Sequence, residues 1–238
     1  MAWALVTGGA KRLGAEICRT LAKNGYDVLI HYRRSAHEAQ DIQQRCLRYG
    51  VRAETLQGDF STTESMQTFI KELKAQYPKI AIVINNVGNF FAGSALQTPL
   101  EEGMALFQLN LHTPLALIQA LIPSLKTEQG SVINIGMAGI NSIKADEKYT
   151  LYRMAKMSLL MLTKSLAKEL ASSHVRVNMV SPGELTISSS LSQTRSLLPM
   201  QRAATVEEVA KVVAFLLSPD SAYITGQNIE VAGGLALS

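Results

Sequence analysis

Short apolar runs alternate with helically periodic stretches along the 238-residue chain, and this alternation constrains the fold more than any other feature. The apolar character of these runs suits strands buried on both faces of a parallel sheet. They are 2–6, 27–31, 53–57, 80–84, 131–135, 176–180 and 228–231. Helical patterns separate them at 13–24, 36–48, 63–76, 100–126, 149–173 and 205–217. The alternation predicts a doubly wound α/β fold, with a seven-stranded, mostly parallel sheet and helices on both faces.

The same alternation predicts a single domain spanning residues 1–238, because no linker or internal repeat interrupts it. It fails only at about 182–199, a Ser/Thr/Leu-rich stretch that opens on Pro-Gly. A long segment without regular structure inside a compact domain is often an active-site loop. We expect a substrate loop there.

Composition excludes several classes of protein. The net charge of +4 comes from 23 basic and 19 acidic residues spread along the chain, so no nucleic-acid partner is expected. The spacing of Cys18 and Cys46 fits neither a metal site nor a redox pair, which predicts a reducing compartment and no metal. Neither a signal peptide nor a membrane-spanning stretch is apparent, so the sequence predicts a cytoplasmic protein without a membrane partner.

A glycine-rich turn at Thr7–Gly14 lies between the first strand and the first helix. Gly8 and Gly14 let the backbone approach a pyrophosphate, and the following helix offers free N–H groups and the positive end of its dipole. Lys11, Arg12 and Leu13 belong to the same turn. Because the turn has the strand-to-helix context that such a motif requires, it predicts a Rossmann fold that binds a dinucleotide. An ordinary strand-to-helix turn is the alternative.

The second strand ends in a basic and polar segment. Tyr32, Arg34 and Ser35 stand where an enzyme specific for NAD presents an acidic residue to the ribose. We therefore predict NADPH as the cofactor, with Arg34, Ser35 and Arg12 as candidates to hold the ribose phosphate. Asp59, just after the third strand, could accept a hydrogen bond from the adenine amino group or cap the next helix.

Tyr152 and Lys156 are four residues apart within a helical pattern, so both side chains should project from one face. An ammonium group one turn away favours phenolate and lowers the pKa of the phenol. The pair therefore predicts a proton donor, although such spacing also occurs on ordinary helices with a solvated lysine. Beside a dinucleotide turn, it indicates transfer of a hydride and a proton.

Further motifs follow in a set order: Asn85–Gly88, Asn110, Arg176–Gly183, Ile224–Gln227 and Val231–Gly234. Together with the two motifs above, they resemble the short-chain dehydrogenase/reductase family over nearly the whole chain, although Ala232 replaces that family's usual aspartate. The resemblance implies that Asn110 supports a proton relay to Lys156, which also binds the nicotinamide ribose. It further implies cofactor contacts from Asn86, Gly88, Pro182, Gly183 and Thr186.

Local details resemble the pteridine reductase branch of this family. They are Lys11–Gly14 in the glycine turn, His31–Ser35 at the end of the second strand and Tyr149–Lys156 around the catalytic pair. The resemblance implies that Phe90 stacks on a pterin, which a phenyl face does well. Packing in a core or lid is the alternative for Phe90.

Met137 departs from the family pattern, which places a serine, or in pteridine reductases an aspartate, at this substrate position. Methionine donates no strong hydrogen bond to a carbonyl or a pterin nitrogen. The segment that follows is also longer than usual, so Asn141, Ser142 or Asp146 could approach the substrate instead.

Three functions therefore remain open: a pterin reductase, a reductase of 3-oxoacyl thioesters or other ketones, and a dinucleotide-binding protein without activity. The second would use a basic patch for the acyl carrier, to which Arg153 could contribute. The helical stretches 100–126 and 149–173 are apolar on more than one face, for example at Leu159, Leu160, Leu162 and Leu166. This pattern, with the family resemblance, predicts a homotetramer or homodimer.

Overall fold

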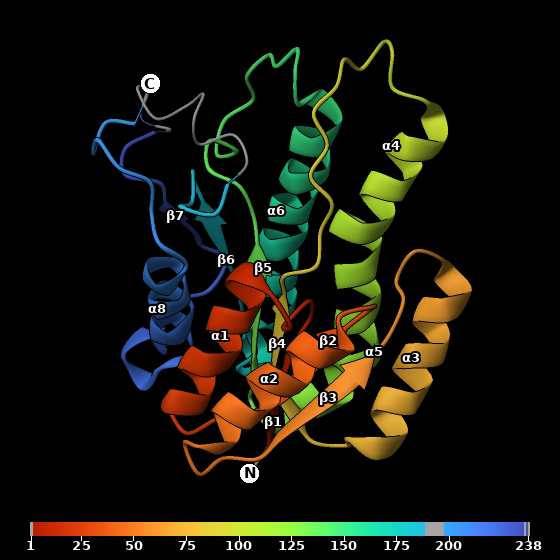
Figure 1. Ribbon diagram of the computed structural model, residues 1–238, viewed down its shortest axis with the longest axis vertical. Coiled ribbons are helices and arrows are strands. Elements are labelled where there is room, and N and C mark those ends of the chain that lie inside the picture. Colours follow the sequence, from red (N-terminus) through yellow and green to blue (C-terminus); the bar gives the residue numbers. More distant parts are fainter. Residues whose placement is uncertain (1, 189–197, 236, 238) are drawn as a thin grey trace.

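The computed structural model describes residues 2–188, 198–235 and 237, and its core is one seven-stranded sheet (Figure 1). The strands are β1 (Trp3–Val6), β2 (Asp27–Tyr32), β3 (Ala53–Gln57), β4 (Ile80–Asn85), β5 (Ser131–Ile135), β6 (Arg176–Pro182) and β7 (Asn228–Val231). Their order is β3-β2-β1-β4-β5-β6-β7, and every neighbouring pair is parallel. The predicted α/β fold is confirmed, and the sheet is wholly rather than mostly parallel.

Helices connect the strands and cover both faces of the sheet (Figure 1). They are α1 (Arg12–Lys23), α2 (Ala36–Leu47), α3 (Thr63–Gln76), α4 (Leu100–Phe107), α5 (Thr113–Thr127), α6 (Thr150–Leu170) and α8 (Val206–Leu217). Short 3₁₀ turns follow α6 at Ala171–Ser173 and α8 at Pro219–Ser221. The sequence placed these helices within a few residues of their ends.

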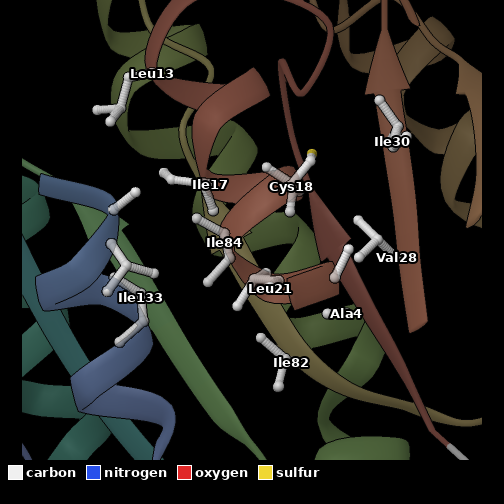
Figure 2. Packing of buried hydrophobic residues seen from close by; sticks show 14 of the residues in the cluster. Ala4, Leu13, Ile17, Cys18, Leu21, Val28, Ile30, Ile82, Ile84 and Ile133 are labelled. Atoms are coloured by element: carbon white, nitrogen blue, oxygen red, sulfur yellow. The ribbon is translucent and has the colours of Figure 1, made fainter. Parts of the chain in front are cut away.

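Side chains alternate between two apolar layers along each strand. Ala4 and Val6 of β1 face α1, α2 and α8, where they pack with Ile17 and Leu21 (Figure 2). The intervening Leu5 faces the opposite layer, made by α3, α5 and α6. Since a strand places successive side chains on opposite faces, burial on both sides explains the unbroken apolar runs in the sequence.

The predicted helix at 100–126 is not continuous. A π-helical turn at Gln108–His112 separates α4 from α5, and the N–H of Thr113 bonds to the carbonyl of Gln108, five residues earlier. The Thr113 hydroxyl donates to the same carbonyl at 2.9 Å. Single π-helical turns inside helices often occur at functional sites. Here the turn holds Asn110, which is completely buried.

One helical stretch, Leu100–Thr127, is long and apolar enough to cross a membrane by length and composition alone. The sequence predicted a helix here, at 100–126, but no stretch of membrane-spanning length. Its α5 portion packs against β4 and places Leu117, Ile118, Leu121 and Leu125 in the core. A buried helix of a globular domain meets the same criteria, so the finding is weak evidence for a membrane span.

Candidate active site

The carboxyl ends of the strands carry the residues singled out from the sequence. Strand order reverses at β1, which lies between β2 and β4, and ligands of open α/β sheets bind at such a switch point. In Figure 1 the loops that follow β4 and β5 rise at this edge beside α6. The cofactor and substrate candidates therefore share one edge of the sheet.

The glycine turn brings two stretches of backbone into close contact. A Cβ on Gly14 would lie 2.1 Å from the carbonyl oxygen of Gly8, so only glycine fits there. Gly8 itself has a φ of +63°, in the left-handed region that glycine tolerates best. The turn leads directly into α1, whose first N–H groups have no partner within the helix. This arrangement fits the pyrophosphate of a dinucleotide.

Thr7 and Asn86 join the turn to the end of β4. The Thr7 hydroxyl accepts hydrogen bonds from the N–H of Asn86 at 2.9 Å and of Val87 at 3.0 Å. In return, the Asn86 amide donates to the carbonyls of Thr7 at 2.9 Å and Gly8 at 3.2 Å. Asn86 was expected to line the cofactor site, and its amide group is engaged in holding the turn.

The basic residues of the turn point in different directions. Lys11 forms an ion pair with Glu38 in the first turn of α2, with 2.6 Å between Nζ and Oε1. The fold thus brings the Glu38 carboxylate to the glycine turn, where Lys11 neutralises its charge. Arg12 has a φ of +53° and reaches the carbonyl of Ile187 at 3.4 Å, within the predicted substrate loop.

The end of β2 contributes Tyr32, which is half-buried, and Ser35, which precedes α2 without a side-chain capping bond. Arg34 is exposed and lines a cavity of about 570 Å³ together with Arg33 and Asp59. Guanidinium groups beside this opening fit a phosphate group.

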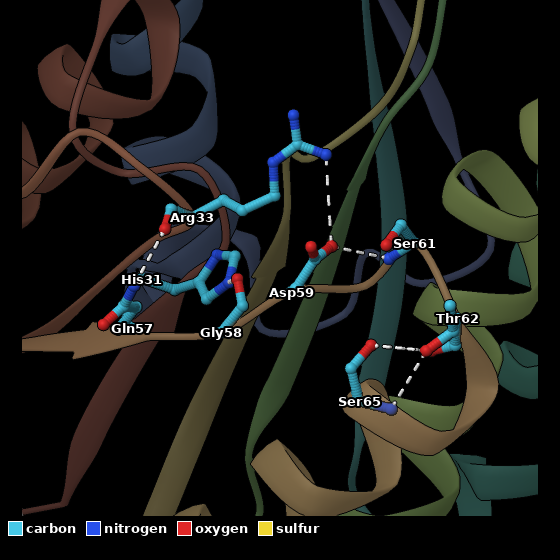
Figure 3. A network of polar contacts seen from close by, with 8 residues as sticks. All are labelled: His31, Arg33, Gln57, Gly58, Asp59, Ser61, Thr62 and Ser65. Carbon is cyan, nitrogen blue, oxygen red and sulfur yellow. Dashed lines mark hydrogen bonds and ion pairs between the residues drawn. The ribbon is translucent and has the colours of Figure 1, made fainter.

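Asp59 does not cap the next helix. Its carboxylate accepts from the N–H of Ser61 at 2.8 Å and lies 3.9 Å from the guanidinium of Arg33 (Figure 3). The cap of α3 is Thr62, whose hydroxyl accepts from the N–H of Ser65 at 3.2 Å. The capping role considered for Asp59 is therefore wrong, and its contact to the adenine stays a prediction.

Asn110 and Lys156 meet beside Gly88, and the ring of Tyr152 lies next to Lys156. A Cβ on Gly88 would lie 2.5 Å from Asn110 Oδ1 and 3.4 Å from Lys156 Nζ, so glycine is required there. Lys156 is 4% exposed, donates to the Ile135 carbonyl at 2.8 Å and lies 5.8 Å from the centre of the Tyr152 ring. The Asn110 amide donates to the carbonyls of Asn89 and Leu106, both at 3.0 Å.

Burial dominates the electrostatics of this group. It lowers the pKa of Lys156 to about 8 and raises the pKa of Tyr152 to about 12. The sequence predicted the opposite direction for Tyr152, with Lys156 lowering its pKa. In the structure the ammonium is directed to the Ile135 carbonyl, and loss of hydration is the stronger effect on both groups.

Asn110 Oδ1 is buried and has no hydrogen-bond partner among the described residues. A buried acceptor of this kind ordinarily bonds a partner or an ordered water. Its position near Lys156 Nζ, seen from Gly88, fits a water held between the two. The unpartnered Asn110 Oδ1 fits a proton relay, and the glycine turn fits a bound dinucleotide.

The two predicted substrate residues have different surroundings. Phe90 is 60% exposed, and its ring centre lies 5.2 Å from that of Tyr152 and 5.5 Å from that of Tyr149. Phe90 is therefore an exposed aromatic side chain beside Tyr152 rather than part of the core. Met137 is half-buried and packs against a small apolar cluster with Ile140, Leu159, Leu160 and Met179.

The segment after Met137 is held by polar contacts from two directions. Both backbone polar groups of Gly139 are bonded. Its N–H donates to Glu230 at 2.9 Å, and its carbonyl accepts from Arg153 at 2.8 Å. Glu230 also accepts from Asn141 at 3.0 Å, and Arg153 pairs with Asp146 at 3.0 Å. Asn141 and Asp146 are thus engaged in positioning this segment.

Arg153 is not available as an open basic patch for an acyl carrier, since its side chain is only 18% exposed and bonds both Asp146 and Gly139. Ser142, the third candidate near the substrate, is exposed.

The end of β6 holds the last group of expected cofactor residues. The Pro182 carbonyl accepts from the N–H of Ala138 at 3.0 Å, and the Gly183 N–H donates to the Val231 carbonyl at 3.1 Å. Thr186 donates through its N–H to the Ala204 carbonyl at 2.9 Å. The predicted substrate loop at 182–199 thus begins and ends in described structure, while its residues 189–197 lie outside the described residues.

Comparisons with known proteins identify the family of the chain. A family model described as enoyl-(acyl carrier protein) reductase matches residues 8–236. The 3-oxoacyl-[acyl-carrier-protein] reductase FabG of Staphylococcus epidermidis is 30% identical over 240 residues, which cover 98% of each chain. The chain belongs to the short-chain dehydrogenase/reductase family of oxidoreductases.

Solved structures have the same fold over the whole chain. Acetoin dehydrogenase YohF from Salmonella typhimurium has a TM-score of 0.90 and 28% identity, covering 100% of this chain and 98% of that one. A blue fluorescent protein from a metagenomic library, solved in complex with NADPH, has a TM-score of 0.91 and 29% identity, with coverage of 99% and 98%. These relatives fit the predicted ketone reductase better than the predicted pterin reductase.

Several residues that shape the site were missed from the sequence. Glu38 and Glu230 act through contacts between segments apart in the chain, for which a single sequence carries no signal. Asp146 and Arg153 were named as separate candidates, and their pairing was missed. His31 was noted only as part of a motif, and Thr7 only as the start of the turn. Their polar side chains at the ends of buried strands were the available signal.

Proposed function

We propose that the chain is an NADPH-dependent reductase that reduces the ketone of a 3-oxoacyl thioester. The observation that carries this proposal is the placement of Asn110 and Lys156 together at Gly88, with the ring of Tyr152 5.8 Å from Lys156 Nζ. The names of the relatives, 3-oxoacyl-[acyl-carrier-protein] reductase and acetoin dehydrogenase, support a ketone as the substrate.

The residues of the chain divide the work as follows. Bound NADPH supplies the hydride. The backbone of Gly8 and Gly14 and the start of α1 hold the pyrophosphate. Tyr152 bonds the substrate oxygen and gives it a proton as the negative charge develops. Lys156 then returns a proton to Tyr152. Asn110 Oδ1, which has no hydrogen-bond partner among the described residues, holds the water that returns a proton to Lys156.

The preference for NADPH over NADH rests on Arg34 just after β2, with Ser35 next to it in the chain and Arg12 in the glycine turn as further candidates. Glu38 opposes it, although Lys11 neutralises that carboxylate. Arg34→Asp should therefore raise the Kd for NADPH about tenfold or more and leave that for NADH within about threefold. Fluorescence titration measures both constants. An unchanged Kd for NADPH would show that Arg34 does not bind the phosphate.

Apolar side chains at the mouth of the site support an acyl substrate. The loops after β4 and β5 meet where the N–H of Gly93 donates to the carbonyl of Lys148 at 2.8 Å. They expose Phe90, Leu96 and Ile143, the last two almost fully. Exposed apolar groups gathered beside a reactive centre are typical of a binding surface.

A pterin is the second candidate substrate, favoured by one observation. Phe90 presents an exposed aromatic ring within 5.2 Å of the ring of Tyr152, where a flat heterocycle could stack. Oxidation of NADPH, followed by absorbance, tests the two substrates directly. Turnover of acetoacetyl thioesters supports the first proposal and turnover of dihydropteridines the second. Binding of NADPH with turnover of neither would favour the non-catalytic protein, consistent with Met137 in place of a donor.

We also propose that the chain works in the cytoplasm as a homotetramer or homodimer. The leucines first considered for the interface are not available, since Leu159, Leu160 and Leu166 are buried within the chain and Leu162 is half-buried. Exposed Met161 on α6 and Met104 on α4 offer an apolar surface instead. Light scattering after gel filtration measures the assembly, and Met161→Glu should shift it towards the monomer.

A further inference from the structure

His31, near the end of β2, is a buried residue whose two ring nitrogens are both bonded. The residue is only 2% exposed. Its Nδ1 lies 3.0 Å from the N–H nitrogen of Gly8, and its Nε2 lies 3.1 Å from the carbonyl oxygen of Gly58. A backbone N–H can only donate, and a carbonyl can only accept. The ring must therefore be neutral, with its proton on Nε2.

The surroundings of His31 hold the ring in this state and orientation. Phe60 stacks on it at a centroid distance of 4.2 Å and an angle of 6°, and Phe69 meets it edge-on at 5.2 Å. Burial lowers the pKa of His31 to about 4, so the ring stays neutral at physiological pH. Figure 3 shows the ring beside Gly58, below the Arg33–Asp59 pair.

The three bonded residues lie at the carboxyl ends of three adjacent strands. Gly8 follows β1, His31 is in β2 and Gly58 follows β3. The backbone adds a further link, because the N–H of Gly9 donates to the His31 carbonyl at 2.8 Å. One imidazole thus connects the glycine turn to the loop that presents Asp59.

We propose that His31 is a positioning residue for the dinucleotide: through Gly8 and Gly58, it holds the glycine turn and the Asp59 loop in the arrangement that binds the adenosine half. The inference rests on the proposed binding of NADPH. Its physical basis is preorganisation, because Gly8 has a φ of +63° and a glycine backbone loses more freedom than any other when it is ordered. Without His31, binding must supply that ordering.

Three substitutions separate the two bonds. His31→Leu removes both, whereas His31→Asn places an oxygen near the position of Nδ1 and keeps an acceptor for Gly8. His31→Gln reaches the position of Nε2 and keeps a donor for Gly58. Tyr26→Phe is the control, because it removes a comparable hydrogen bond, from the Tyr26 hydroxyl to the Leu217 carbonyl at 3.2 Å, away from this edge.

The test measures Kd for NADPH, 2′,5′-ADP and reduced nicotinamide mononucleotide by titration, well below the melting temperature of each variant. We expect His31→Leu to weaken NADPH and 2′,5′-ADP about tenfold, with the mononucleotide within about twofold. His31→Asn and His31→Gln should recover part of the loss. These two variants carry the test if His31→Leu does not fold.

A purely structural histidine would give a different pattern. If the variants lower the melting temperature as Tyr26→Phe does and leave every Kd within about twofold of the native value, the inference is overturned. Equal weakening of both fragments also overturns it, since the adenosine half is then not the part that His31 positions. A native chain that binds neither NADPH nor NADH would instead refute the proposed function, and this inference with it.

Discussion

The cofactor end and the substrate end lie on the same edge of one sheet, yet they are built differently. At the cofactor end, in the turns after β1, β2 and β3, backbone groups and polar side chains connect neighbouring strands, as Thr7 and His31 do. At the substrate end, in the loop after β5, charged side chains from elements distant in the chain hold the backbone, as Glu230 and Arg153 hold Gly139. The first arrangement can be recognised as a motif in the sequence, whereas the second exists only in the folded chain.

This difference predicts that the two ends can be damaged separately. Changes at the cofactor end should alter dinucleotide affinity, and changes at the substrate end should alter turnover or substrate KM. The following substitutions test that separation, from the largest expected effect to the smallest.

Tyr152→Phe should have the largest effect, at the substrate end. Loss of the proton donor should lower kcat by about 10²- to 10⁴-fold, while the Kd for NADPH stays within about twofold. Steady-state kinetics and NADPH titration measure the two quantities. Full reductase activity in this variant would rule out Tyr152 as the donor.

Gly14→Ala should damage the cofactor end selectively. The added Cβ would lie 2.1 Å from a backbone oxygen of Gly8, which must move, so we expect about 100-fold weaker binding of NADPH. Gly103→Ala, within α4, is the matched control. Its added Cβ would meet only Leu151 Cδ1 of α6, at 3.4 Å. That control should gain about 0.5–1 kcal/mol of stability. Equal NADPH affinity in both variants would contradict the proposed pyrophosphate site.

Arg153→Met should affect the substrate end more mildly. It frees the Gly139 carbonyl and leaves Asp146 without its partner, so we expect kcat/KM to fall about tenfold with an unchanged Kd for NADPH. Arg153→Lys should recover only part, because lysine lacks the fork that bonds both groups. The double variant Asp146→Asn/Arg153→Met should lose less than the sum of the single changes. Additive losses would show that the pair does not act as a unit.

The last prediction concerns stability and its pH dependence rather than activity, at the junction of the two ends. Lys156 has a folded pKa of about 8 against an ordinary value of 10.5, so its burial costs most below pH 8, where it is charged. The stability it contributes is present above pH 10.5 and is lost as the pH falls through 8. Lys156→Met should therefore be more stable than the native chain at pH 7, by on the order of 3 kcal/mol.

Urea unfolding at pH 7 and at pH 9.5 measures this difference, and the advantage of the Lys156→Met variant should shrink at the higher pH. Loss of the bond from Lys156 to the Ile135 carbonyl offsets part of the gain at both values. A difference that does not change with pH would show that Lys156 titrates as an exposed lysine does.

Much of the fold and part of the site could be predicted from the sequence. Apolar runs and helical periods located all seven strands and the helices, because burial on two faces or on one stripe leaves a repeating pattern. The π-helical turn at Asn110 was missed, since it adds one residue to a helical turn without breaking the apolar pattern. The pteridine reductase branch rested on short local matches, whereas whole-chain comparison favours other relatives.

The sequence by itself determined the order of the elements, the glycine turn and the spacing of Tyr152 and Lys156, because each depends on residues close together in the chain. The tertiary structure alone decided the environment of those residues. It placed Glu38 beside Lys11, buried Lys156 against Ile135 and held Gly139 between Glu230 and Arg153. Ion pairs and the loss of hydration depend on distances between segments far apart in sequence, and only packing sets those distances.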